Sequence, residues 1–594
     1  MVRDLRLIGR ALINYYCPPV RLSARSLRGA VLFLWAALAG ACGHIHETGD
    51  VPPAAVTHPD TGPSTFWNSA TVYFLLTDRF ENGDPRNDMA LGRAHDGAVL
   101  RNFEGGDLAG VLRKIEEGYF DSLGVTAIWM TPFVEQIHAG VDEGTGKTYA
   151  YHGYWTRDWT AVDPALGTTD DLRAVVDAAH RHGIRILMDA VINHTGPVTP
   201  QDPAWPDDWV RTGPNCSYRS YTTTVDCTLV ATLPDVRTDR GAPVELPPAL
   251  LEKWGHEGRR DQEVAELDAF FQRTGYPRAP RYYVIKWLTD WVRELGFDGY
   301  RVDTAKHFGP SVSAELKREA EVALTDWRRT HPAQVRDTLP FYMVGEVYGW
   351  EPSQGRDYNF GDRSVDFFSN GYDALINFGF KSDTGSLDGL FTRYSATIHQ
   401  GPLRGVAVLN YLSSHDDGSP YDVDRKDPIG AGIRLLLAPG GAQIYYGDEL
   451  ARPLKVQGAE GDANLRSFMN WGDLDRQAEV LQHWRKLGRF RRAHPAVGAG
   501  VHRTLQAKPF IFSCGLETGS RVDRVLVAMD QGEGAKIIPV FDLFPDGTEL
   551  VDAYSGVSGK VRKGSVSLTT GSGLVLLAEQ VTGAAAGAGG PEDR

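Results

Sequence analysis

The feature that most constrains the fold is an alternation of strand and helix patterns between residues 71 and 446. Eight segments rich in β-branched and aromatic residues, bounded by turn residues, are predicted to be strands. They are Thr71–Leu76, Val125–Met130, Ile184–Val191, the first part of Gly296–His307, Phe341–Val347, Ala374–Phe378, Val406–Leu412 and Ala442–Tyr446. Helical periodicity separates several of them, at Leu108–Leu123, Asp170–His182 and Arg281–Leu295.

Eight strand–helix units predict an α/β fold whose parallel strands close into a (β/α)8 TIM barrel. The segment Ile184–Val191 is largely apolar, which is typical of a parallel strand covered on both faces. The alternative is an open doubly wound sheet, which normally carries a glycine-rich phosphate-binding loop after its first strand. No such loop follows Thr71–Leu76. We therefore expect the barrel, with functional residues at the carboxyl ends of its strands.

Two stretches depart from the alternation and predict additional domains. Residues 195–280, after the third strand, are rich in Pro, Asp, Thr and Gly, and they predict an inserted sub-domain or functional loop. Residues 497–580 hold short alternating segments and predict a C-terminal antiparallel β domain, a β-sandwich. The barrel domain is thus expected over residues 65–496, and the Gly/Ala-rich residues 581–594 are expected to be disordered.

The N-terminal residues carry the pattern of an export signal. Three arginines precede the uncharged apolar run Gly29–Ala41, which is too short to span a bilayer. The residues leading to Cys42 resemble a bacterial lipoprotein signal. We therefore predict a signal segment at residues 1–42, a lipid anchor on Cys42, a tether at residues 43–64, and a periplasmic or cell-envelope location.

The charge and cysteine content of the chain indicate which partners and bonds to expect. The net charge of -14 argues against a nucleic-acid partner, because Lys and Arg on phosphates supply most of that affinity. We expect a monomer whose membrane contact is limited to the lipid anchor. In an exported protein, Cys216 and Cys227 are suitably spaced for a short-loop disulfide, and two unpaired cysteines are the alternative.

Polar and charged residues follow four of the predicted strands. They are Asp189, Asn193 and His194 after the third strand, Arg301, Asp303, Lys306 and His307 after the fourth, Glu346 after the fifth, and His415, Asp416 and Asp417 after the seventh. The carboxyl ends of barrel strands meet on one face, so these side chains are expected to converge. Packing several carboxylates together costs stability unless function requires them, which makes a purely structural role for the set the weaker interpretation.

Two of these carboxylates fit glycosidic-bond cleavage, which uses two carboxyl groups in unlike environments. Arg301 and Asp303 point to the same side of their strand, and a neighbouring guanidinium lowers a carboxyl pKa, so Asp303 is expected to be an ionised nucleophile. Glu346 follows the apolar run Phe341–Val344, so burial is expected to raise its pKa and suit it to acid–base catalysis. These residues alone leave the reverse assignment open, and a structural ion pair is the alternative for Arg301 and Asp303.

Four segments, in this order along the chain, resemble the signature regions of the α-amylase family, glycoside hydrolase family 13. They are Asp189–His194, Gly299–His307, Gly345–Val347 and Ser414–Asp416. Three further segments resemble the periplasmic α-amylase branch of Gram-negative bacteria, namely Phe133–His138, Tyr411–His415 and Leu436–Gly440. The resemblance extends over about residues 66–500 and implies a TIM-barrel glycosidase.

The resemblance implies a role for each matched residue. Asp303 is implied as the nucleophile, Glu346 as the acid/base, and Asp416 as the third carboxylate, which binds the distorted sugar. The residues implied to contact substrate are His152, Tyr154, His194, Arg301, Lys306, His307 and His415. Asp417 is a departure, because relatives usually carry a small hydroxyl residue there. An extra carboxylate at this position is expected either to raise neighbouring pKa values or to bind a cation.

Residues 82–88 are dense in the hard oxygen donors that calcium prefers, although their Asn-Gly and Asp-Pro pairs are equally typical of a plain turn. Together with Gly105–Asp107, they resemble a calcium site of cyclodextrin-forming and related bacterial amylases. The implied ligands are Asn82, Asp84, Asn87, Asp88, Asp107 and the carbonyl of Gly105. A second, more widely shared calcium site is implied at Asn193, Asp235 and His307.

The resulting expectation is a calcium-dependent enzyme that cleaves α-1,4-glucosidic bonds within starch, glycogen or maltodextrins and retains the anomeric configuration. An exo-acting α-glucosidase or a transglycosylase that uses the same carboxylates is one alternative. A non-catalytic sugar-binding lipoprotein is another, although such relatives tend to lose the catalytic carboxylates.

Overall fold

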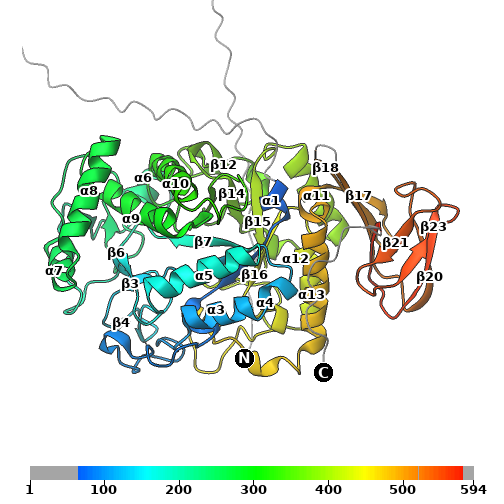
Figure 1. Ribbon diagram of the computed structural model, residues 1–594, viewed down its shortest axis with the longest axis horizontal. Helices are drawn as coiled ribbons and strands as arrows, with labels where there is room; N and C mark the ends of the chain where they lie inside the picture. Colours follow the sequence, from blue (N-terminus) through cyan, green and yellow to red (C-terminus); the bar gives the residue numbers. More distant parts are fainter. Residues whose placement is uncertain (1–64, 519–520, 580–594) are drawn as a thin grey trace, which may run out of the picture. The chain divides into compact units, whose positions relative to one another are not determined.

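The computed structural model describes residues 65–518 and 521–579. The predicted signal segment, tether and tail, at residues 1–42, 43–64 and 581–594, lie outside these ranges. Eight parallel strands close into a barrel in the order β1-β16-β15-β14-β11-β10-β7-β2. Figure 1 labels β7, β14, β15 and β16 of this barrel together with the helices around it. They are β1 (Thr71–Leu75), β2 (Ala127–Met130), β7 (Arg185–Ala190), β10 (Gly299–Val302), β11 (Tyr342–Gly345), β14 (Ala374–Asn377), β15 (Ala407–Tyr411) and β16 (Gly441–Tyr445). The barrel prediction is confirmed. No strand extends more than one residue beyond its predicted segment, whereas β2, β10 and β11 are shorter than predicted by two or more residues at one end.

Helices connect most of the strands. Those outside the insert are α1 (Thr65–Ser69), α2 (Thr77–Phe80), α3 (Leu108–Glu116), α4 (Tyr119–Ser122), α5 (Thr169–Arg181), α9 (Pro280–Leu295), α10 (Pro310–Thr330), α11 (Leu387–His399), α12 (Pro428–Leu436), α13 (Ala478–Ala493) and α14 (Ala496–Ala499). The single helix predicted over Leu108–Leu123 is wrong, because Gly118 adopts a left-handed φ of 70° that separates α3 from α4. Among the described residues, no helix has the length and apolarity that a membrane span requires.

Some connections in the barrel are built from strands. The chain between β2 and α5 forms the antiparallel pairs β3 (Val134–Gln136) with β6 (Thr156–Val162) and β4 (Val141–Asp142) with β5 (Lys147–Thr148). The chain between β11 and β14 forms the pair β12 (Asp357–Asn359) and β13 (Ser364–Asp366) in place of a long helix. Both of these connections begin at the carboxyl ends of barrel strands, where they can form the walls of a site.

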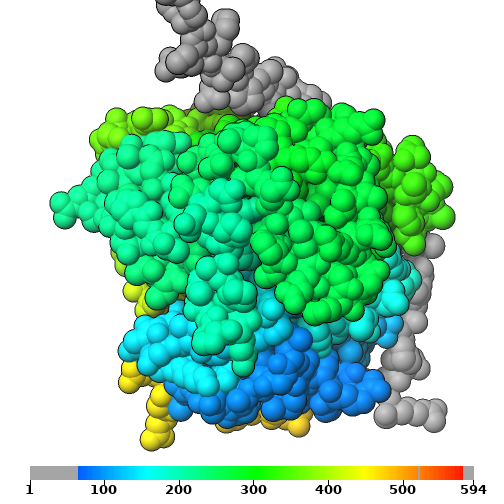
Figure 2. All heavy atoms as spheres, turned by 90° about the vertical axis from the view of Figure 1, so that its left-hand side faces the viewer, coloured from blue at the N-terminus to red at the C-terminus, as the bar shows by residue number. Residues whose placement is uncertain are grey.

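The insert after β7 contains more helix than its composition predicts. Its elements are β8 (Val210–Arg211), α6 (Tyr221–Val225), β9 (Asp235–Val236), α7 (Pro248–His256) and α8 (Arg260–Thr274). Helix α8 buries Leu267 and Phe270 at helical spacing and ends at Gly275, which is left-handed. These are ordinary helix signals, which the surrounding Pro- and Thr-rich residues mask. In Figure 2, blue-green and green atoms from this part of the chain form much of the visible surface.

A cluster of tryptophan side chains packs the insert against the barrel. The ring of Trp287 in α9 stacks on Trp209 of the insert, with centroids 6.0 Å apart, and meets the edge of Trp254 in α7 at 6.3 Å. On the barrel side, Trp287 also stacks with Trp159 of β6 at 6.1 Å. Aromatic side chains of this size bury large apolar areas, so this cluster ties the insert to α9.

The C-terminal residues form two antiparallel layers. One sheet has the order β17-β18-β19-β24-β21-β22, and the second is the pair β20 and β23. The strands are β17 (Val501–Gln506), β18 (Ile511–Thr518), β19 (Arg521–Ala528), β20 (Gly534–Pro539), β21 (Glu549–Asp552), β22 (Ser558–Lys560), β23 (Ser565–Thr570) and β24 (Val575–Glu579). Alternate residues of the larger sheet face two cores, so Phe512 joins the barrel core while Ile511 packs toward Val566 of the smaller sheet.

A buried ion-pair cluster also joins the insert to the barrel. Asp158 of β6 is fully buried, and its Oδ2 atom binds Lys253 Nζ of α7 at 2.8 Å and Arg259 Nη2 at 2.9 Å. Burial raises the pKa of Asp158, but these two cations lower it more, and the net pKa lies below its usual value. The stabilisation is therefore present above about pH 4, the ordinary carboxyl pKa, and is lost as the pH falls through the lower folded-state value.

Replacing Asp158 with Asn is expected to lower the free energy of unfolding by about 1.5–3 kcal/mol, because a buried charged acceptor is lost. Lys253 keeps its contact with Glu135 at 3.0 Å, and Arg259 keeps its contact with Glu263 at 2.6 Å. Denaturant titration followed by tryptophan fluorescence measures this, since the neighbouring cluster reports on the insert. The matched control is Arg173→Ala, which removes an exposed pair with Glu294 and is expected to cost about 0–1 kcal/mol. Equal losses in the two variants would contradict the role given to Asp158.

Candidate active site

The polar residues predicted at strand ends lie together at the carboxyl edge of the barrel. Asp189 belongs to β7 and Arg301 to β10, and the paired register of these strands places the two residues side by side. Asp303 follows β10, Glu346 follows β11, and Asp416 follows β15. Because all eight strands are parallel, their ends meet at one edge, and segments far apart in sequence build one site.

Arg301 is the centre of this group. Its side chain is 1% exposed, and Nη1 contacts Asp189 Oδ1 at 2.9 Å and Asp303 Oδ1 at 2.7 Å. Its Nη2 atom contacts Glu346 Oε2 at 3.0 Å. One buried guanidinium thus binds three carboxylates, and charge-assisted bonds of this length fix their positions relative to one another.

Two aromatic residues complete the surroundings of Arg301. Its guanidinium carbon lies 5.0 Å from the ring centre of Trp129 and 5.6 Å from that of Tyr154. Asp189 Oδ2 accepts hydrogen bonds from Trp129 Nε1 at 2.9 Å and from the Tyr154 hydroxyl at 2.7 Å. Asp189 therefore supports Arg301 and Tyr154 together. Sequence reasoning missed Trp129, because an aromatic residue inside a strand is indistinguishable from core.

The two central carboxyl groups have different acidities. Burial raises the pKa of Asp303 to about 6, although Arg301 opposes the rise. Burial also raises the pKa of Glu346 to about 8, again opposed by Arg301 and reinforced by the charges of Asp303 and Asp416. The expectation for Glu346 is confirmed, whereas the lowered pKa expected for Asp303 is wrong, because desolvation outweighs its ion pair. Near neutral pH, Asp303 is the more ionised group and Glu346 the more protonated one.

The backbone also orients Glu346. The Thr304 N–H donates a hydrogen bond to Glu346 Oε2 at 2.8 Å. Thr304 has a φ of 46°, which is a strained conformation for a β-branched residue. The turn after β10 therefore points the amide at Glu346 at a conformational cost.

Three histidines surround Tyr154. Its ring stacks on His415 with centroids 5.1 Å apart and lies 5.9 Å from the roughly parallel ring of His152. The Tyr154 carbonyl contacts His194 Nε2 at 3.0 Å. Burial lowers the pKa of all three histidines, to about 4 for His194. They are thus neutral at pH 7, and each neutral imidazole has one nitrogen that can donate a hydrogen bond to a hydroxyl group and one that can accept.

Lys306 and His307 follow β10, where Lys306 contacts the chain after β11 and His307 contacts the insert. Lys306 Nζ donates to the Tyr348 carbonyl at 2.9 Å, and His307 Nδ1 contacts the Thr224 carbonyl at 3.2 Å. Tyr218 packs edge-on against the His307 ring at 4.9 Å. Tyr218 and Tyr348 are 45% and 52% exposed, and sequence reasoning gave neither a role, because no local signal marks an exposed tyrosine.

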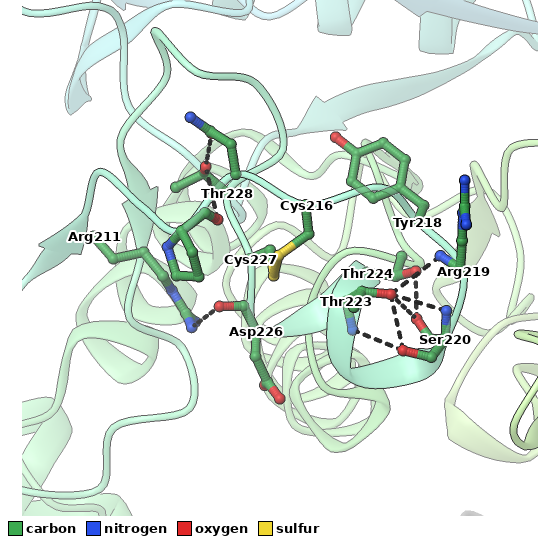
Figure 3. Close-up of a disulfide and its surroundings, with 12 residues drawn as sticks. Arg211, Cys216, Tyr218, Arg219, Ser220, Thr223, Thr224, Asp226, Cys227 and Thr228 are labelled. Atoms are coloured by element: carbon green, nitrogen blue, oxygen red, sulfur yellow. Dashed lines mark hydrogen bonds between the residues drawn. A yellow bond between two sulfur atoms is a disulfide. The ribbon is translucent and has the colours of Figure 1, made fainter.

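A disulfide closes the loop that carries Tyr218 and Thr224. Cys216 and Cys227 are bonded, with an S–S distance of 2.04 Å, so the expected pairing is present (Figure 3). Within the loop, the Ser220 hydroxyl accepts a hydrogen bond from the Thr223 amide at 3.1 Å and begins α6. The remaining described cysteine, Cys514, is buried.

Asp416 is the most open of the three implied catalytic carboxylates. Its side chain is 37% exposed, and it lies 3.6 Å from His415 Nε2 and 3.5 Å from Ser414 Oγ. Burial of the surrounding site raises its pKa. The adjacent Asp417 is buried, and its carboxylate binds Lys381 Nζ at 3.0 Å. The cation expected for Asp417 is therefore an ammonium group of the chain itself.

Most residues of the first implied calcium site lie together. Asn82 Nδ2 contacts both carboxylate oxygens of Asp88, at 3.0 and 3.2 Å. A Cβ atom on Gly105 would lie 2.5 Å from Asn82 Nδ2 and 2.7 Å from Asp88 Oδ1, so Gly105 approaches this pair closely. Asp107 accepts the Gly83 amide at 2.9 Å. The Oδ1 atoms of Asn82 and Asn87 are buried and have no hydrogen-bond partner among the described residues, which suits a cation.

Asp84 departs from this group, because its carboxylate binds Arg86 Nε at 2.7 Å on the surface. At the second implied site, Asp235 Oδ2 is buried beside Asn193 without a hydrogen bond of normal geometry, and burial raises the pKa of Asp235 to about 7. His307 contacts Thr224, as described above. Throughout the described residues, no cluster of three or more His, Cys, Asp or Glu side chains is arranged to hold a metal ion.

Comparisons with known proteins agree with this geometry. The family model described as the α-amylase catalytic domain matches residues 74–485. The periplasmic α-amylase of Escherichia coli (strain K12) is 36% identical over 511 residues, which cover 76% of this chain and 70% of the relative. A cyclomaltodextrin glucanotransferase of Bacillus sp. (strain 38-2) is 25% identical over 542 residues, covering 87% of this chain and 66% of the relative.

A solved structure supports the fold independently. The crystal structure of an Anoxybacillus α-amylase aligns with a TM-score of 0.58 and 22% identity, covering 87% of this chain and 99% of that one. The family match extends over most of the chain and contains Asp303, Glu346 and Asp416. This chain is therefore a glycoside hydrolase that belongs to the α-amylase family, glycoside hydrolase family 13.

Proposed function

We propose that the protein is a retaining α-amylase that hydrolyses internal α-1,4-glucosidic bonds of starch, glycogen or maltodextrins. The observation that carries this proposal is the sharing of one guanidinium, that of Arg301, by Asp303 and Glu346. Sharing one cation keeps the two carboxyl groups close together, as a covalent mechanism needs. Their pKa values of about 6 and about 8 divide the roles of nucleophile and acid.

In the proposed reaction, the Glu346 carboxyl group donates its proton to the glycosidic oxygen while Asp303 attacks the anomeric carbon. Water then attacks the glycosyl–enzyme ester, and the Glu346 carboxylate accepts the proton of that water. Arg301 and the Thr304 amide hold the two carboxyl groups in place during both steps. Asp416 and the neutral histidines bind sugar hydroxyls, and the Tyr154 ring packs on an apolar sugar face.

A second candidate is transglycosylation, which a sugar hydroxyl in place of water would produce. Support for this candidate comes from the 25% identity to a cyclomaltodextrin glucanotransferase. An exo-acting α-glucosidase would use the same residues and differ only in how loops close the site. A non-catalytic sugar-binding protein is disfavoured, because Asp303, Glu346 and Asp416 are all retained around Arg301.

The first test is time-resolved proton NMR of maltoheptaose blocked at its non-reducing end. The proposal predicts internal cleavage with α-anomers as the first products. Asp303→Asn is expected to lower kcat by at least about 10⁴-fold while sugar binding persists, because the nucleophile alone is lost. Cleavage of only the unblocked sugar would indicate an exo-acting enzyme, longer or cyclic products a transglycosylase, and no turnover a binding protein.

The pH dependence of activity follows from the two carboxyl groups. Activity requires ionised Asp303, so it rises through about pH 6, and it requires protonated Glu346, so it falls through about pH 8. The variant Glu346→Gln is expected to lose the alkaline limb on an aryl glycoside whose leaving group needs no proton. Initial rates from pH 4 to pH 10 measure both limbs. An alkaline limb that persists in Glu346→Gln would contradict the assignment.

The proposal includes structural calcium at two positions. Asn82, Asn87, Asp88, Gly105 and Asp107 would hold the first ion, and Asn193, Asp235 and His307 the second. Support comes from the buried Oδ1 atoms of Asn82 and Asn87 and the buried Oδ2 atom of Asp235, which have no hydrogen-bond partner among the described residues. Bound calcium would supply positive charge that ties the loop after β1 to the start of α3.

Calcium removal is expected to lower Tm by about 3–5 °C, because a ligand at 100 times its Kd stabilises the folded state by about 2.7 kcal/mol. Isothermal titration of the chelated protein is expected to show weaker binding in Asn82→Ala. The matched control is Asp84→Asn, which is expected to keep its affinity because Asp84 binds Arg86. A Tm indifferent to calcium would contradict the proposal, and equal losses in the two variants would contradict this ligand set.

Export to the periplasm and a lipid anchor on Cys42 complete the proposal. Support comes from the apolar run Gly29–Ala41 after basic residues, and from the 36% identity to a protein named as periplasmic. The protein would then act as a monomer on α-glucans in the cell envelope.

A further inference from the structure

Asp416 differs from its two partner carboxylates in how it is held. Asp303 and Glu346 contact Arg301 at 2.7 and 3.0 Å. The Asp416 carboxylate contacts Ser414 Oγ at 3.5 Å and His415 Nε2 at 3.6 Å, and this histidine is neutral. Contacts of this length are too long to fix a side chain, so the direction of Asp416 depends on the backbone that carries it.

The neighbouring residue anchors that backbone. Asp417 is 5% exposed, and its Oδ2 accepts the Tyr411 hydroxyl at 2.5 Å. Its Oδ1 binds Lys381 Nζ at 3.0 Å and accepts the Ser419 amide at 3.2 Å. Lys381 Nζ also donates to the Ser419 carbonyl at 2.8 Å. Lys381 and Tyr411 therefore hold both ends of the turn that follows Asp416.

These contacts join two separate loops of the barrel. Lys381 lies in a short 3-10 helix, Phe380–Ser382, after β14, whereas Tyr411 is the last residue of β15. On the other side of Asp416, Arg466 Nε donates to the His415 carbonyl at 2.8 Å. The segment that presents Asp416 is thus held from both sides, and Asp417 supplies one of the two attachments.

We propose that Asp417 is a positioning residue which, through its bonds to Lys381 and Tyr411, sets the backbone that presents Asp416 to the sugar. This inference rests on the proposed function. The proposed effect of Asp417 on Asp416 is geometric, because the ammonium of Lys381 lies 3.0 Å from the Asp417 carboxylate and opposes its charge. Losing either partner lets the turn move, and a misplacement of about 1 Å at a reacting centre lowers the rate by about 100-fold.

The test compares Asp417→Ala, Lys381→Met, their double variant and Lys381→Arg. The two single variants are expected to lower kcat on maltoheptaose by about 10–100-fold, with KM changed less than about 3-fold. The double variant is expected to lower kcat by about as much as the more severe single variant, and by less than the product of the two losses. Lys381 and Asp417 share one ion pair, and the double variant leaves no buried charge without its partner. Lys381→Arg keeps the ion pair and is expected to recover most of kcat. Both limbs of the pH profile are expected to stay in place.

The matched control is Lys317→Met. The Lys317 side chain is 1% exposed, against 8% for Lys381, and it binds Asp373 at 2.5 Å. Asp373 precedes β14, at the opposite end of the barrel from the site. This variant is expected to lower Tm while kcat stays within about 2-fold. It shows what loss of a buried lysine–aspartate pair does away from Asp416.

Three results would overturn the proposal. Unchanged kcat in Asp417→Ala, with a Tm loss like that of Lys317→Met, would make the role purely structural. A shift of either pH limb would make it electrostatic. A parent protein that hydrolyses no α-glucan would remove the proposed function and this inference together, which is distinguishable from an active parent with an unaffected Asp417 variant.

Discussion

The buried guanidinium of Arg301 is the interaction on which the rest of the site depends. Carboxylates packed this closely repel one another, and removing them from water is costly unless a cation pairs with them. Arg301 binds Asp189, Asp303 and Glu346 at once, which satisfies both requirements. Burial and the neighbouring charges then separate the acidities of the two catalytic groups.

The barrel strands bring the residues of this site together, and the loops after the strands surround it. Parallel strands bring residues from β7, β10, β11 and β15 to one edge without any local sequence contact. On one side, the disulfide loop of the insert places Tyr218 and Thr224 against His307. On another, the pair of Lys381 with Asp417 connects the loops after β14 and β15. The strands set which residues meet, and the loops decide how a glucan chain reaches them.

Much of this arrangement is predictable from sequence, because strand alternation and polar strand ends are local patterns. Arg301 lies in β10 and Asp303 directly follows its last residue. The two are two residues apart along an extended chain, so their contact follows from the two-residue period of a strand. The raised pKa of Asp303 is not predictable in this way, because burial depends on every packed neighbour. Trp129 and Lys381 were missed for a similar reason, since each acquires its role from a residue distant in sequence. Helix α8 has ordinary helical spacing and a glycine at its end, but the Pro- and Thr-rich residues on either side of it made the whole segment resemble an irregular loop.

The most direct test of the account is to trap the glycosyl–enzyme. A maltosyl fluoride carrying a 5-fluoro substituent slows the second step and allows the ester to accumulate. After proteolysis, mass spectrometry is expected to find the added sugar on the peptide that contains Asp303, and none on that peptide in Asp303→Asn. A label on Glu346, or turnover of the reagent with inverted configuration and no ester, would contradict the assignment of Asp303 and Glu346 around Arg301.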